Sequence, residues 1–161
     1  MKKKKKKNGR KSVNRLVPRA GLALKNEFYL ETSMIVSLMI ERKLRNVITR
    51  VENRNPGSGF EIGKCVKRLK YLILKNADPL LVKYFEIRLI DELRNWKNYR
   101  NAILRDMCEI HVTRNRMQKM AEDGIVLMQE LNSSYKKFKQ EWKKELIKKP
   151  ETITNTDEIT A

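Results

Sequence analysis

The sequence predicts an all-α protein: a single bundle of four or five helices with a long C-terminal helix. Three observations predict this class. Apolar residues recur at spacings of three and four, turn-forming residues separate the periodic segments, and no segment combines two-residue alternation with hairpin turns. With 161 residues, the chain can form one domain plus tails and bury a core without disulfides or metals.

The first two helices are expected over residues 27–53 and 61–75. Each carries an apolar stripe of the width that a surface helix buries against a core. The stretch NRNPGSG, residues 53–59, separates them, because Pro and Gly interrupt helical periodicity.

A third helix is expected from Pro79 to about residue 94. Asp78 suits its N-cap, and Pro79 suits the first helical position, where a missing N–H removes no hydrogen bond. The stretch WKNYRNAILRDMCEIH, residues 96–111, then follows in one of two ways. It either continues this helix or forms a separate helix after a kink near Asn95.

The last helix is expected to run from a cap at Val112-Thr113 to about Lys148. Its apolar residues alternate at intervals of four and three, the a/d pattern of helix-on-helix packing within the domain or between protomers. We call this pattern the 117–142 seam; it consists of Met117, Ala121, Gly124, Met128, Leu131, Tyr135, Phe138 and Trp142. Residues 149–161 lack periodicity and are expected to form a flexible tail.

The basic charge is concentrated at the N-terminus. The net charge is +18; residues 1–25 hold eleven Lys or Arg and no acid, whereas residues 26–142 hold 22 basic and 15 acidic side chains. We expect residues 1–26 to form a disordered basic arm that contacts RNA or another nucleic acid, the alternative being a solvated tail. The candidate nucleic-acid-binding residues are Lys2, Lys3, Lys4, Lys5, Lys6, Lys7, Arg10, Lys11, Arg15 and Arg19.

Several classes of protein are disfavoured by what the sequence lacks. It has no Gly-rich phosphate loop, and a single His with two distant cysteines, Cys65 and Cys108, does not make a usual zinc site. We therefore expect neither a metal nor a cofactor. The longest apolar run, MIVSLMI at 34–40, is too short to span a bilayer, and no apolar run follows the N-terminal lysines, so we expect a cytoplasmic protein without a membrane partner.

His111 is the only histidine, so any acid–base chemistry by an imidazole must use it. On a helix, Arg105 and His111 would lie on adjoining faces, about 120° apart. Arg could hold a scissile phosphate while His moves a proton, which is metal-independent cleavage of RNA. The alternative places His111 at a helix end, satisfied by the last carbonyls. The candidate supporting residues are Arg100, Asn101 and Asp106.

A helical bundle with a WKNYRN helix, then a His, then a Thr before a long final helix with an internal Gly resembles HEPN-domain proteins over residues 28–145. The resemblance implies an endoribonuclease of toxin or defence systems, with an active site formed across a dimer. It also implies a signature of Arg and a polar residue, with His four to six residues beyond. Arg100-Asn101 matches the opening but has Arg105 at the His position, whereas Arg105-Asp106 pairs with His111 at the looser spacing.

Two functional hypotheses follow from the sequence. The first is a HEPN-like RNA-binding protein or metal-independent endoribonuclease, or an inactive variant of one. The second is a non-catalytic basic helical protein that serves as a nucleic-acid-binding or assembly accessory factor of a phage or mobile element. A homodimer or a helical partner protein is expected to pack at the 117–142 seam.

Overall fold

The computed structural model describes residues 8–57, 61–109 and 111–148, with side chains from 15–57, 61–109 and 111–147. The described residues form helices only, which confirms the all-α prediction. The helices are α1 (Asn8–Lys25), α2 (Tyr29–Glu52), α3 (Ile62–Leu74), α4 (Pro79–Tyr84), α5 (Ile87–Glu109) and α6 (Arg114–Lys148).

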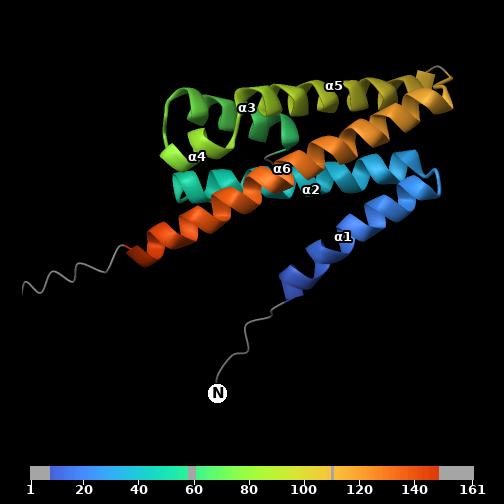
Figure 1. Cartoon of the computed structure of the whole chain (residues 1–161). Coiled ribbons are helices and arrows are strands. Elements are labelled where there is room, and N and C mark those ends of the chain that lie inside the picture. Colours follow the sequence, from blue (N-terminus) through green and yellow to red (C-terminus); the bar gives the residue numbers. More distant parts are fainter. Residues whose placement is uncertain (1–7, 58–60, 110, 149–161) are drawn as a thin grey trace, which may run out of the picture.

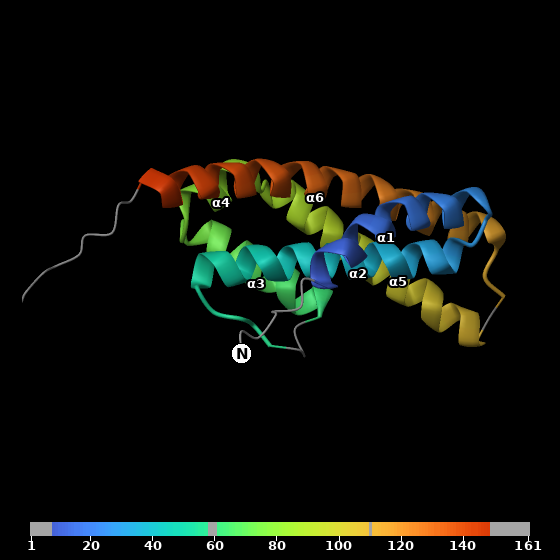
Figure 2. The same cartoon turned by 90° about the horizontal axis from the view of Figure 1, so that it is seen from below.

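The two longest helices, α2 and α6, pack along each other in the middle of the molecule (Figures 1 and 2). Helix α1 lies against α2 on one side, and α3, α4 and α5 lie on the other side (Figure 1). Helix α3 packs between α2 and α5, while α4 covers the C-terminal half of α6. The core therefore forms where α2, α3, α5 and α6 meet.

The prediction of a disordered arm is wrong for residues 8–25, which form α1. Ala20 and Ala23 are buried against the bundle, and Leu16 packs on the core. Small side chains let α1 approach α2 closely, but they contribute little to the hydrophobic pattern on which a sequence prediction depends. The helical domain thus begins near residue 8 rather than residue 27. Residues 1–7 and 149–161 lie outside the described part of the chain.

Of the two alternatives for residues 96–111, continuation of the preceding helix is confirmed, but a break within the helix expected from Pro79 to about residue 94 was not predicted. Helix α5 runs through Asn95 without interruption, and the break falls instead at Phe85, which has an extended backbone (φ −122°, ψ 99°). Phe85 is buried, and its ring packs edge-on against Phe138 of α6 with a centroid distance of 5.5 Å. A tertiary contact of this kind can override the local helical periodicity.

The other helix ends match the sequence prediction closely. Asp78 caps α4, since its Oδ1 accepts a hydrogen bond from the Leu81 N–H at 2.9 Å, and Pro79 is the first helical residue. Thr113 precedes α6, and its Oγ1 accepts a long hydrogen bond, 3.4 Å, from the Arg116 N–H. None of the described helices is long and apolar enough to cross a membrane.

The 117–142 seam packs inside its own chain. Its residues Ala121, Gly124, Met128, Leu131 and Phe138 are buried. Helix α6 places them against α2, α4 and α5, which selects packing within the domain. A homodimer or partner helix would find the central side chains of the seam already covered, so it would have to contact other positions.

Candidate nucleic-acid interface

The two residues expected to cleave RNA, Arg105 and His111, are both exposed but belong to different segments of the chain. Arg105 is exposed on α5, and His111 is exposed in the connection to α6. Neither side chain lines the two hollows described below. Asp106 accepts a hydrogen bond from Arg116 at 2.9 Å, which joins the end of α5 to the start of α6 and raises the pKa of Arg116.

Arg100 links helices rather than lining an open cleft. Its Nη1 donates to the Ser37 Oγ of α2, and its Nη2 donates to the Asn101 Oδ1 at 3.0 Å. Burial lowers the pKa of Arg100, although a guanidinium stays charged at neutral pH. Arg100 therefore fixes α5 on α2 and at the same time orients Asn101, which is exposed.

The predicted basic arm is described only in part. Lys2, Lys3, Lys4, Lys5, Lys6 and Lys7 lie outside the described residues, and Arg10 and Lys11 belong to α1 with side chains outside the description. Arg15 is exposed. Arg19 donates to Glu31 of α2 from Nε at 3.0 Å and from Nη2 at 2.7 Å. Arg19 thus has a structural role in holding α1 on α2.

A basic hollow lies between α3 and α5, and we call it the α3–α5 groove. It has a volume of about 720 Å³. Five cations and one carboxylate line it: Lys64, Lys67, Lys70, Arg94, Lys97 and Glu61. The groove therefore carries an excess of positive charge in a concave surface, where field lines are focused.

Two contacts fix the geometry of the groove. The Lys70 Nζ lies 2.6 and 2.8 Å from the two carboxylate oxygens of Asp91, which bridges α3 to α5. Lys97 lies over Gly63, where a Cβ would be 3.4 Å from the Lys97 Nζ. The first contact joins Lys70, near the end of α3, to Asp91, near the start of α5. The second joins Gly63, at the start of α3, to Lys97, further along α5. The two helices therefore run antiparallel. Their basic residues therefore face a shared hollow.

The two amides in the groove are oriented as donors. Lys97 Nζ donates to the Asn98 Oδ1 at 3.1 Å, and Arg100 donates to the Asn101 Oδ1. With both oxygens accepting, the Nδ2 groups of Asn98 and Asn101 are left to donate. Ammonium, guanidinium and amide donors together suit a ligand rich in acceptor oxygens and negative charge, such as a phosphodiester backbone.

The sequence prediction missed this groove, although a signal was present. Residues 62–77 contain no Asp or Glu, and Lys64, Lys67, Arg68 and Tyr71 follow the helical spacing i, i+3, i+4, i+7. The net charge of residues 26–142 does not reveal this stripe, because acidic residues elsewhere in that range offset its lysines and arginine. Its counterpart on α5 could be recognised only once the antiparallel packing was known.

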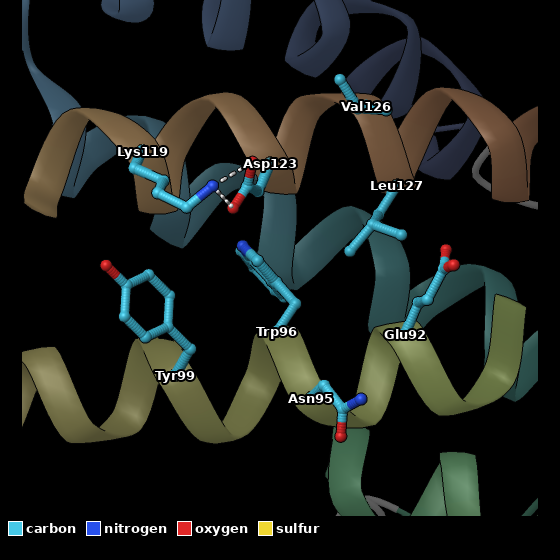
Figure 3. Close-up of a pocket in the computed structure, with 8 residues that line it drawn as sticks. All are labelled: Glu92, Asn95, Trp96, Tyr99, Lys119, Asp123, Val126 and Leu127. Atoms are coloured by element: carbon cyan, nitrogen blue, oxygen red, sulfur yellow. Dashed lines mark hydrogen bonds and ion pairs between the residues drawn. The ribbon is translucent and has the colours of Figure 1, made fainter.

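A second hollow lies on the other side of α5, against α6, and we call it the α5–α6 hollow. It has a volume of about 440 Å³ and is lined largely by Trp96, Tyr99, Val126 and Leu127 (Figure 3). At its edge, the Lys119 Nζ lies 3.2 Å from an oxygen of Asp123 (Figure 3). Because Glu92 also lines this largely apolar hollow, its two carboxylates outnumber its one cation, and it does not suit a polyanion.

Tight packing closes the inner end of the α5–α6 hollow. Trp96 is 4% exposed, and its Nε1 donates to the Met120 carbonyl at 2.8 Å. A Cβ on Gly124 would lie 2.6 Å from the Trp96 Cζ2, so only glycine fits beneath the indole. Gly124 therefore permits the close approach of α5 and α6.

Among the described residues, no three His, Cys, Asp or Glu side chains gather as a metal site would require. Comparisons of the chain with protein-family models, with curated proteins and with solved structures give no match. The resemblance to HEPN-domain proteins therefore stays a prediction.

Proposed function

We propose that this protein binds nucleic acid, RNA in particular, by holding the phosphate backbone in the α3–α5 groove. The observation that carries the proposal is the composition of that groove. Five cations and two amide donors from two helices converge on one hollow that contains a single carboxylate. Lys70 of the groove is paired with Asp91, and aspartate or glutamate side chains elsewhere on the described surface pair with other cations, such as Arg19, Arg45, Arg88, Arg116 and Lys119.

Binding of this kind draws its free energy mainly from the release of counterions. For single strands the slope of log affinity against log salt is about −0.7 per phosphate neutralised. Because Lys70 is paired with Asp91, four cations of the groove are left to engage phosphates, and the slope is then about −2.8 from the groove alone. The basic residues before α1 would add to that slope without adding sequence preference.

The test is to titrate the full chain with a fluorescently labelled 20-nucleotide RNA between 50 and 200 mM salt. A variant that lacks residues 1–7 keeps α1 but loses six lysines. We expect this variant to bind RNA with a smaller salt slope, since the groove remains. Deletion of 1–25 is unsuitable because it would uncover the core against which Ala20 packs.

Two results would overturn the proposal. One is loss of all RNA binding when residues 1–7 are removed, which would assign binding to the arm. The other is binding to vesicles of anionic lipid with no binding to RNA, which would assign the charge to a membrane surface.

Cleavage by Arg105 and His111 is a separate prediction, because neither residue lines the groove. It is tested by incubating RNA with the protein in the absence of metal, beside His111→Ala and Arg105→Ala. Cleavage by the wild type that both substitutions remove would support the HEPN-like hypothesis. If wild type and variants all leave the RNA intact, the protein binds without cutting.

A further inference from the structure

Resting on the proposed function, we infer that the α3–α5 groove takes single-stranded rather than duplex nucleic acid, with Tyr71 stacking on a base. Tyr71 lines the groove and is 49% exposed, an unusual position for a ring that could be buried. It stands on the same face of α3 as Lys64 and Lys67, so phosphate and base contacts would lie along one line.

The Tyr71 ring is supported from one side. The Arg68 guanidinium lies 5.1 Å from the ring centroid, in the position of a cation–π contact. Arg68 is itself paired with Glu52 of α2, which holds the guanidinium in place. Tyr71 also lines the groove, where a base can stack on its exposed ring.

Leu74 extends this apolar end of the groove by one turn and is 61% exposed. The α3–α5 groove is therefore lined by both charged and apolar side chains. Lys64, Lys67 and Lys97 supply charge, and Tyr71 and Leu74 supply apolar surface. A single strand offers a charged backbone with unstacked bases, whereas a duplex keeps its base faces stacked inside.

The length of α3 along the groove limits how many phosphates the groove could contact. From Glu61 to Leu74, α3 rises by about 20 Å. In a duplex, where the bases are stacked, each strand has one phosphate per 3.4 Å, and a strand with unstacked bases is longer per nucleotide, so at most about six phosphates would lie along this length.

The experiment measures the affinity of the full chain for a 20-nucleotide RNA, single-stranded and annealed to its complement, at one salt concentration. We expect the single strand to bind more tightly. Loss of one stacked base is worth about 1–3 kcal/mol, so Tyr71→Ala should weaken single-strand binding by about 5- to 150-fold. Tyr71→Phe is the matched control, since it keeps the ring, and we expect it to bind within about twofold of wild type.

The outcomes separate this inference from the function on which it rests. If the wild type binds neither RNA, the proposed function fails. If single strand and duplex bind equally and Tyr71→Ala changes neither, the proposed function stands and the single-strand inference is overturned. If Tyr71→Ala and Tyr71→Phe weaken single-strand binding equally, the hydroxyl rather than the ring is responsible, and stacking is overturned.

Discussion

The two sides of α5 differ sharply in chemistry although one helix supplies both. The side facing α3 presents Arg94, Lys97, Asn98 and Asn101 to a basic groove. The side facing α6 buries Trp96 and leaves a smaller, largely apolar hollow whose charged residues are Glu92 and the Lys119–Asp123 pair. We therefore expect the proposed binding and the stability of the fold to depend on different sides of α5. Substitutions on the first side should change affinity, and those on the second should change the free energy of unfolding.

Trp96→Ala should produce the largest effect on the α6 side. It removes a buried indole and its hydrogen bond to the Met120 carbonyl, and truncations of this kind lower the free energy of unfolding by about 3–5 kcal/mol. Chemical denaturation followed by circular dichroism measures the change. An affinity for RNA that falls while the variant remains folded would contradict the separation of the two sides.

Charge reversal tests the α3 side. Lys67→Glu places a carboxylate in the groove, and we expect RNA affinity to fall about tenfold, with a salt slope about 0.7 shallower for a single strand. Lys119→Glu is the matched control, because it makes the same charge change at the α5–α6 hollow. Fluorescence anisotropy should show Lys119→Glu within about twofold of wild type. Equal losses in both variants would mean that net charge rather than the groove determines binding.

Gly124→Ala should change the free energy of unfolding by less than Trp96→Ala does, because two contributions to it have opposite signs. The new Cβ would meet the Trp96 ring at 2.6 Å, and overpacking of this kind destabilises by about 1–3 kcal/mol. Better helix propensity offsets about 1 kcal/mol of that loss. The matched control is Gly21→Ala in α1, where a Cβ meets nothing within 4 Å. Denaturation should show Gly21→Ala slightly more stable than wild type and Gly124→Ala less stable; the same sign at both sites would contradict the close approach.

The sequence predicted the helices that strong local signals delimit. Helices expected at 27–53 and 61–75 are found at Tyr29–Glu52 and Ile62–Leu74, because Pro, Gly and capping residues interrupt the chain there. Elements that depend on tertiary contacts were missed. Helix α1 is held by the small residues Ala20 and Ala23.

The candidate site was harder to predict, because it is assembled from two helices. The basic stripe on α3 is visible in the sequence as a run without acids. Its partners on α5 are not, since Asn98 and Asn101 face the groove only through the antiparallel packing that Lys70 and Asp91 fix. The residues that the sequence motif singles out, Arg105 and His111, lie instead on the exposed last part of α5 and in the connection after it.

The two cysteines provide the most sensitive check that groove substitutions leave the core unchanged. Cys108 is exposed, whereas Cys65 is buried on the side of α3 that faces away from the groove. Burial disfavours the thiolate and raises the pKa of Cys65 from 9.0 to about 11. Since the thiolate is the reactive form, Cys65 should stay protected as pH rises, until pH approaches that value.

At pH 8 we expect a thiol reagent to modify one cysteine per native chain and both after denaturation. Lys67→Glu should leave this ratio unchanged, because Lys67 and Cys65 project from opposite sides of α3, one exposed and one buried. The pH dependence has a definite sign: modification of Cys65 in the folded protein should speed up between pH 9 and 11. Rapid modification of Cys65 in Lys67→Glu at pH 8 would show that the substitution opened the core, and its loss of RNA affinity would then say nothing about the groove.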